Sequence, residues 1–152
     1  MFERPTSELS DDGVALDERS EAEAQTCVLV CISCRRPEDG EAYPRPGAAF
    51  AEAVRQAGEA AGVAVAVQRV RCLGNCKRGL SALVRRADSA TQSWTYVFGD
   101  LDPAHDAAAL IEGARLFDGS EDGFMPWRGR PSCLKRGVVA RIPPLAFPGD
   151  AE

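Results

Sequence analysis

Apolar residues gather in the middle of the chain, in runs whose spacing predicts alternating strands and helices. Residues 26–32 are a continuous β-branched and apolar run, typical of a strand buried on both faces of a parallel sheet. Residues 48–61 have helical periodicity, with Gly62 as the expected C-cap, and residues 63–67 predict a second strand. The buried positions expected of this helix are Phe50, Val54, Ala57 and Ala61. A crossover helix between neighbouring strands implies that the two strands pair in parallel.

In the second half of the apolar region, the predicted strands are joined by a short turn and not by a crossover helix. Residues 80–85 and 94–98 are short runs on either side of a polar turn, which predicts an antiparallel pair. A helix is expected from Asp102 as N-cap, through Pro103 at its first position, to about Phe117. Its apolar face is expected to be Leu110, Ile111, Ala114 and Phe117. The predicted fold is α/β, with the order β-α-β-β-β-α and a mixed central sheet flanked by helices.

Charge divides the chain into three parts. Residues 1–24 hold eight acids and two bases, which leaves fifteen acids and sixteen bases for the rest of the chain. We expect this acidic leader to be disordered, because it has too few apolar residues to bury. Residues 25–120 form the expected domain. Residues 121–152 are a proline-rich basic extension predicted to pack on it, with a short edge strand within 137–142 and no acid between Met125 and Pro148.

The bulk properties exclude several classes of protein. A chain of 152 residues suits one domain with a modest core. No apolar run approaches the length of a membrane span, and the first residues lack the basic and apolar regions of a secretory signal. Six cysteines are too sparse for a secreted disulfide scaffold. We therefore expect a cytoplasmic protein whose paired cysteines serve metal or redox chemistry.

Four of the cysteines form two close pairs. Cys31 and Cys34 end the first predicted strand, and Cys72 and Cys76 follow the second. Because parallel strands place their carboxyl ends at one edge of a sheet, the two pairs should lie close together. Four thiolates suit an iron–sulfur cluster or a tetrahedral zinc ion.

The residues around the thiols extend the predicted site. Gly74 and Gly79 allow the backbone to approach sulfur closely, and Arg71 and Lys77 supply positive charge beside the cofactor. Further cations flank the ligands at Arg35, Arg36 and Arg78. Such a face would favour a reduced, more anionic cluster and would attract an acidic redox partner.

The run Cys72-Leu-Gly-Asn-Cys76, placed after a βαβ unit and before two antiparallel strands, resembles the thioredoxin-like 2Fe–2S ferredoxins over roughly residues 26–117. A narrower similarity reaches about residue 148. It is to bacterial proteins described as predicted metal-binding and ferredoxin-like, often encoded beside cobalamin-synthesis genes. It is carried by residues 30–36, 72–76, 96–99, 126–131 and 141–144. The resemblance implies a thioredoxin-like fold, one 2Fe–2S cluster, electron transfer, and a role in cobalamin or cobalt metabolism. Related domains also dimerise.

The cysteines also allow other assignments. The first cysteine pair is more closely spaced than is usual in these ferredoxins, so Cys27 or Cys133 could complete the ligand set. Cys31 and Cys34 could instead be a thioredoxin-like redox dithiol, and the four thiols could hold or deliver zinc. No nucleic-acid-binding motif is present, and His105 is expected on a helix surface. The preferred reading is a small electron carrier, not an enzyme.

Overall fold

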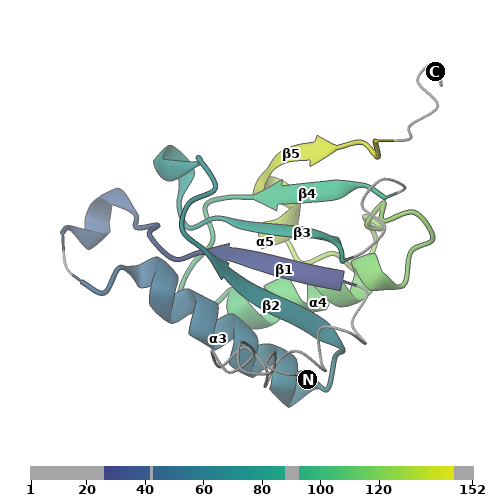
Figure 1. Ribbon diagram of the computed structural model, residues 1–152, viewed down its shortest axis with the longest axis horizontal. Coiled ribbons are helices and arrows are strands. Elements are labelled where there is room, and N and C mark those ends of the chain that lie inside the picture. The colour runs from purple at the N-terminus through teal and green to yellow at the C-terminus, as the bar shows by residue number, and fades with distance from the viewer. Residues whose placement is uncertain (1–25, 42, 88–92, 146–152) are drawn as a thin grey trace, which may run out of the picture.

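The computed structural model describes residues 26–41, 43–87 and 93–145 (Figure 1). The acidic leader and most of the predicted 88–93 turn lie outside these ranges. The elements are β1 (Thr26–Cys31), a 3-10 turn (Pro37–Asp39), α3 (Pro46–Ala61), β2 (Val65–Val70), a 3-10 turn (Cys76–Arg78), β3 (Ala82–Arg86), β4 (Thr95–Phe98), α4 (Ala107–Asp118), α5 (Cys133–Arg136) and β5 (Val138–Ile142).

The five strands form one mixed sheet in the order β2-β1-β3-β4-β5. β1 and β2 pair in parallel, as the crossover helix predicts, and every other neighbouring pair is antiparallel. The predicted β-α-β-β-β-α order and mixed sheet are confirmed. β5 adds an edge strand within the residues predicted to form one.

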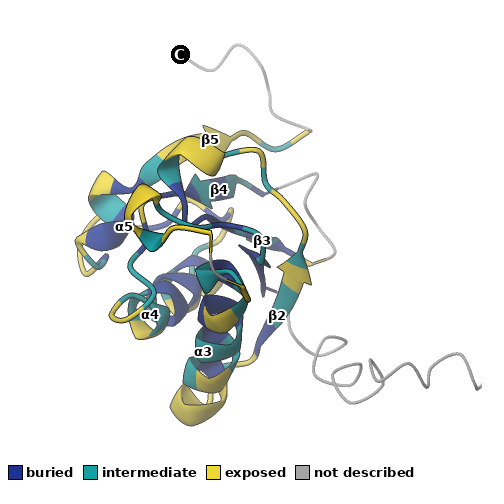
Figure 2. Ribbon diagram, turned by 90° about the vertical axis from the view of Figure 1, so that its left-hand side faces the viewer, coloured by how far each residue is buried: buried dark blue, intermediate teal, exposed yellow. Residues whose placement is uncertain are grey.

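α3 and α4 lie side by side on one face of the sheet, and α5 adjoins α4 (Figures 1 and 2). The main core fills the space between sheet and helices. Its largest fully buried side chains include Phe50, Val54, Tyr96, Phe98, Leu110 and Phe117. All four predicted apolar positions of α4 are buried. In α3, Phe50 and Val54 are buried but Ala61 is exposed, since the helix ends there and Gly62 caps it in the left-handed conformation.

Several element boundaries differ from prediction, and two of the differences have a clear cause in the structure. The second strand runs from Val65 to Val70 and not from Val63, because Val63 closes the turn after α3 by donating to Gly58 O. The last predicted helix begins at Ala107 with Asp106 as N-cap, so the predicted start at Asp102 is wrong. Asp102 instead caps a preceding turn, in which its carboxylate accepts from Ala104 N at 2.7 Å.

The C-terminal segment contributes to the core as well as covering it. Met125 and Leu134 are fully buried, and Met125 N donates to the Tyr96 hydroxyl at 2.9 Å. Arg130, also buried, donates to the carbonyls of Met125 and Pro126. The segment is therefore anchored to β4 by side chains and by β5 pairing.

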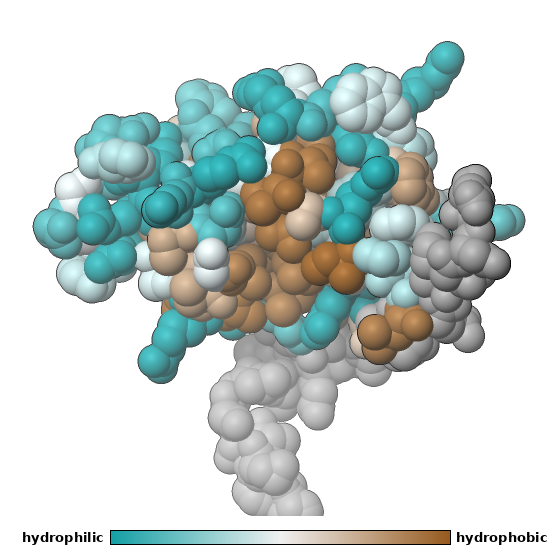
Figure 3. Space-filling view, turned by 90° about the horizontal axis from the view of Figure 1, so that it is seen from above, coloured by the Kyte–Doolittle hydropathy of each residue, from teal (hydrophilic) through white to brown (hydrophobic). Residues whose placement is uncertain are grey.

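The second face of the sheet carries a smaller apolar cluster. Its buried members are Cys27, Leu29 and Ala66, with Val70 and Leu83 packed against them. The view from above in Figure 3 shows apolar side chains gathered in the middle of the molecule, with hydrophilic ones around them. None of the helices in the described residues has the length and apolar character needed to span a bilayer.

Candidate metal centre

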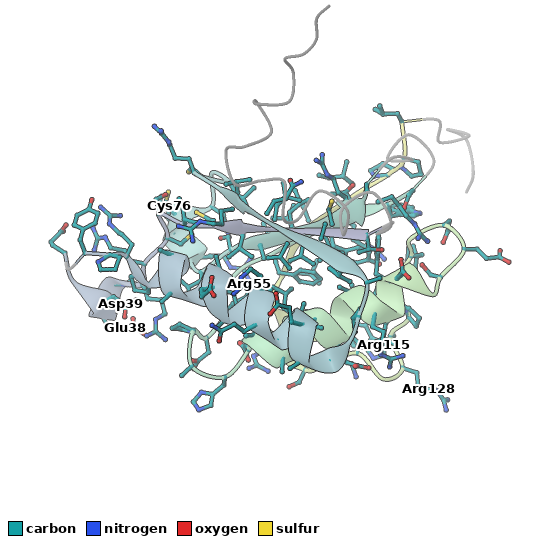
Figure 4. All side chains as sticks on the ribbon, turned by 60° about the horizontal axis from the view of Figure 1, so that its bottom comes forward. Glu38, Asp39, Arg55, Cys76, Arg115 and Arg128 are labelled. Carbon is teal, nitrogen blue, oxygen red and sulfur yellow. The ribbon has the colours of Figure 1, made fainter. Side chains whose placement is uncertain are left out.

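The two cysteine loops leave the same edge of the sheet. Cys31 at the end of β1 pairs in register with Val70 at the end of β2, and Ile32 N donates to Val70 O at 2.9 Å. The chain then turns into the Cys31–Cys34 loop on one strand and the Cys72–Cys76 loop on the other. Figure 4 shows Cys76 at this end of the sheet.

The Cys31–Cys34 loop has both of its cysteines buried, and the first turn of α3 holds its backbone. Cys31 is 1% exposed and Cys34 is 5% exposed. Gly47 N donates to Cys34 O at 3.0 Å, and a Cβ placed on Gly47 would lie 2.3 Å from Cys31 O. The start of α3 therefore contacts the backbone of this loop, although the intervening turn and prolines separate the two in sequence. Only glycine permits that approach.

The Cys72–Cys76 loop is open to solvent, with both of its thiols exposed. Gly74 has φ +73°, and its N–H points to the Cys72 sulfur at 3.2 Å. Lys77, in the turn that follows, is exposed as well. The second loop is thus shaped mainly by its own backbone.

Polar contacts join the two loops. Ser33 Oγ donates to Arg71 O at 2.5 Å, which ties the first loop to the residue before Cys72. Asn75 Nδ2 donates to Ser81 Oγ at 2.9 Å, and Ser81 hydrogen-bonds the Cys34 thiol.

Gly79 brings the two loops into direct contact. This residue is buried, and a Cβ placed on it would lie 3.3 Å from the Cys34 sulfur. Close packing at Gly79 therefore holds the end of the second loop against the first pair.

The thiols influence one another's protonation. The Cys34 thiol donates a hydrogen bond to Cys31, which lowers the pKa of Cys31 to about 5 although burial opposes the shift. The same hydrogen bond, with burial, raises the pKa of Cys34. The pKa of Cys76 is raised first by a hydrogen bond with Cys72, and the negative charge on Cys31 adds to that effect. Cys31 and Cys76 therefore lie within one another's electrostatic field.

One cavity receives a thiol from each pair. Its volume is about 320 Å³, and it is lined by Ser33, Cys34, Arg35, Arg36, Pro37, Arg45, Cys76 and Lys77. The Nε of Arg45 is buried with no hydrogen-bond partner in the described residues, while its terminal nitrogens donate to Ser33 O and the Tyr43 hydroxyl. A cationic cavity with thiols on its wall suits an anionic, thiolate-bound group.

The four thiols do not form a closed cage in this conformation. Within the described ranges, no three His, Cys, Asp or Glu side chains are arranged to hold a metal ion. Because Cys31 and Cys34 are packed while Cys72 and Cys76 are exposed, closing the set requires the second loop to turn its thiols inward. The donor chemistry and the shared cavity fit a thiolate-bound metal group.

The cations predicted to surround the thiols are partly neutralised. Arg35 pairs with Glu41 at 3.1 Å, Arg36 with Asp39 at 3.0 Å, and Arg78 with Asp100 at 2.8 Å. Figure 4 shows Asp39 and Glu38 next to each other, in the turn that follows the first loop in sequence. Arg71 and Lys77 have no carboxylate partner in the part of the chain that the structure describes. The basic surface is therefore narrower than the sequence suggests.

The other candidate residues lie elsewhere. Cys27 is buried on the second face of the sheet, beside Leu29 and Ala66. Cys133 is buried in α5 and interacts with Asp106, and burial raises its pKa to about 11. All six cysteines fall in the described ranges and none forms a disulfide. His105 is exposed and lies 3.4 Å from Asp102.

Sequence reasoning missed several residues that build the site. Ser81 had a signal, since it is a polar residue inside an apolar run and becomes fully buried. Ser33, Arg45 and Gly47 had none, because their roles arise from the way α3 packs on the first loop.

Comparison with known proteins gives a family and a structural likeness. The sequence model of a family described as "Protein of unknown function (DUF1636)" matches residues 28–144. No curated protein matches the chain. A solved structure of a thioredoxin-like [2Fe-2S] ferredoxin from Aquifex aeolicus is 15% identical, with a TM-score of 0.49 over 78% of this chain and 93% of that one. A second structure of such a ferredoxin from Aquifex aeolicus, the wild type, is 14% identical, with a TM-score of 0.46 over 77% and 98%. At these TM-scores the likeness adds no weight to a functional assignment.

Proposed function

The chain belongs to this DUF1636 family, and we propose that it is a small electron carrier that holds one 2Fe–2S cluster through Cys31, Cys34, Cys72 and Cys76. One observation carries the proposal: a single cationic cavity is lined by a thiol from each pair, although the pairs are far apart in sequence. The electrostatic effect of Cys31 on Cys76 supports the same grouping. Four thiolates are the usual ligand set for such a cluster.

When bound, the cluster supplies one-electron redox chemistry. The protein's own residues hold and tune it. Cys31 and Cys34 are buried in a loop whose backbone is held by the start of α3. The Gly74 N–H donates to the Cys72 sulfur at 3.2 Å, which fixes the position of that sulfur in the second loop. Arg45 and Lys77 in the cavity wall offset negative charge, which favours the reduced form.

The proposed partners are acidic redox proteins that dock at the cluster edge. Arg71 and Lys77 are exposed there without carboxylate partners in the described residues, so their charge is available to a partner. A place in the cytoplasm, and a role in cobalamin or cobalt metabolism, are the parts of the proposal that rest on sequence alone. The cobalamin role rests on the family resemblance.

Anaerobic purification tests the cluster directly. The protein should be brown, with sulfur-to-iron charge-transfer absorption that bleaches on addition of dithionite. Cys76→Ser should lose or shift these bands. Cys27→Ser is the matched control, since it replaces a buried thiol outside the cavity, and its spectrum should be unchanged. A colourless protein with one bound zinc per chain would instead make this a zinc-binding or delivery protein.

A specific observation favours a second candidate, a thiol–disulfide oxidoreductase. The lowered pKa of Cys31, beside the raised pKa of Cys34, is the pattern of a reactive dithiol. Against it, both thiols are buried, and the pattern leaves Cys72 and Cys76 without a role. Reduction of insulin disulfides by the metal-free protein, abolished by Cys31→Ser, would favour this candidate.

A further inference from the structure

Exposed large apolar side chains concentrate in one segment. Of the six in the described ranges, five fall within residues 124–145: Phe124, Trp127, Val139, Ile142 and Leu145. Trp127 is 62% exposed and Phe124 is 42% exposed. Two of them, Phe124 and Trp127, line one groove, and apolar groups that lie together on a surface commonly mark a site of interaction.

A groove runs through this segment and combines apolar and cationic walls. It has a volume of about 360 Å³, and none of its lining residues also lines the thiol cavity. Its lining includes the buried Met125, the half-buried Val138, the exposed aromatic residues Phe124 and Trp127, and two cations, the half-buried Lys135 and the exposed Arg141.

Two groove cations, Lys135 and Arg141, lie over aromatic rings and do not pair with the carboxylates that the structure describes. Lys135 Nζ lies 4.9 Å from the centre of the Trp127 ring, and Arg141 Cζ lies 4.6 Å from that of Phe124. Neither cation has a carboxylate partner in the described residues. No acid occurs in the sequence between Met125 and Pro148. Their charge is therefore uncompensated and available to an anionic group.

The groove borders the free edge of the sheet. Val138 and Arg141 belong to β5, which is last in the strand order and pairs only with β4. Four of its five residues are exposed. An edge strand can accept an extended peptide through backbone hydrogen bonds, with side-chain specificity supplied by an adjacent groove.

We propose that the β5 edge and this groove form a docking surface for an extended acidic segment of a partner protein. The partner's carboxylates pair with Lys135 and Arg141, and its alternate apolar side chains contact Phe124 and Val138, which line the groove and are at least partly exposed. This surface is separate from the thiol cavity, so the proposal goes beyond electron transfer and holds with or without a cluster.

Two other occupants fit less well. A nucleic acid would need open aromatic faces for base stacking, whereas Phe124 and Trp127 already have cations over their rings. If a second copy of the chain paired through β5, Arg141 and the cations near it would face the same cations of the other copy. No acid lies between them in this segment, so the repulsion would be unfavourable.

Calorimetry on the full chain, as purified and metal-free, tests the proposal. The probes are a short peptide alternating glutamate and valine, and the same peptide with glutamine in place of glutamate. The acidic peptide should bind and perturb tryptophan fluorescence, because Trp127 and Trp94, the two tryptophans of the chain, both contact groove cations. The glutamine peptide should bind at least about tenfold more weakly.

Two charge variants locate the binding. The double variant Lys135→Gln with Arg141→Gln should weaken binding about tenfold, with folding checked by circular dichroism. Arg128→Gln is the matched control, since Arg128 is an exposed cation of the same segment outside the groove lining (Figure 4), and it should change affinity by less than about twofold. Equal binding of both peptides, no binding at millimolar concentration, or equal losses in both variants would overturn the proposal. So would tighter binding of oligouridylate, or self-association that the double variant abolishes.

Discussion

The two cysteine loops are built in different ways. The Cys31–Cys34 loop has both of its cysteines buried, and the first turn of α3 fixes its backbone through Gly47. The Cys72–Cys76 loop exposes both thiols and depends on the left-handed conformation of Gly74. One half of the proposed ligand set is therefore a preformed part of the core, and the other lies on a surface loop.

This asymmetry suggests an order of assembly. A preformed pair lowers the conformational entropy lost on binding, because its side chains are already ordered. If the proposed cluster is bound, the exposed pair would meet iron or a cluster donor first and the buried pair would complete the set.

Thiol reactivity should show the largest difference. In the folded, metal-free protein, iodoacetamide should alkylate Cys72 and Cys76 at least about a hundredfold faster than Cys31 and Cys34. The first pair reacts only after local opening, and a hundredfold protection corresponds to about 2.7 kcal/mol of opening free energy. Time-resolved mass spectrometry of the labelled peptides measures the rates.

The control is the urea-unfolded protein, where all the cysteines should react at similar rates. Rapid labelling of Cys31 in the folded protein would contradict a preformed, closed loop. It would also strengthen the dithiol candidate, since the lowered pKa of Cys31 would then be expressed in reactivity.

A methyl group on Gly47 should disrupt the first loop. Because the added Cβ would meet Cys31 O at 2.3 Å and Cys34 N at 3.0 Å, both of them backbone atoms, neither can give way cheaply. Gly47→Ala should lower the free energy of unfolding by about 2 kcal/mol. Urea denaturation measures the change.

Gly58→Ala is the matched control in the same helix. There the added Cβ would meet only the end of the Ile111 side chain at 3.3 Å. The helical preference for alanine should make this change neutral or stabilising by up to about 1 kcal/mol. Equal losses in the two variants would show that the contact of α3 with the thiol loop is unimportant.

Much of the fold could be predicted because local signals agree with it. The apolar run of β1, the helical stripe of α3 and its glycine cap together specify a parallel βαβ unit. The end of β2 at Val70 was harder to predict from the sequence, because Gln68 and Arg69 are not typical strand residues. They are tolerated because β2 is an edge strand that leaves polar side chains partly in solvent.

The candidate site was also predictable only in part. Sequence spacing alone places the two pairs after neighbouring parallel strands. It could not show that Cys31 and Cys34 are buried, or that Glu41 and Asp100 neutralise nearby arginines. Those facts depend on how distant segments pack, and no local pattern encodes them.

A methyl group on Gly74 should have a smaller effect, confined to the second loop. Its φ of +73° disfavours any residue with a Cβ, but nothing lies within 4 Å of that position. Gly74→Ala should therefore cost roughly 1 kcal/mol of stability. It should also change the alkylation rate of Cys72, whose sulfur receives the Gly74 N–H.

Gly62→Ala is the control that separates the cost of backbone strain from the effect of the Gly74 N–H on the Cys72 sulfur. Gly62 has a similar φ of +69° and equally open surroundings at the end of α3. Its replacement should cost the same roughly 1 kcal/mol while leaving the reactivity of Cys72 unchanged. If both variants altered Cys72 equally, the Gly74 N–H would have no specific role at the sulfur.

The smallest expected effect is a change in the pKa of Cys76 when Cys31 is replaced. It tests most directly whether the two loops share one electrostatic environment. The negative charge on Cys31 contributes to the raised pKa of Cys76, after the larger contribution of Cys72. Cys31→Ser removes that charge, so the pKa of Cys76 should fall, and its thiolate should form at lower pH. The pH dependence of Cys76 alkylation in the metal-free protein measures this, with Cys133→Ser as a control that should leave the profile unchanged. An unchanged pKa in Cys31→Ser would mean that the loops lie too far apart to feel each other, and one cluster bridging them would then lose its physical basis.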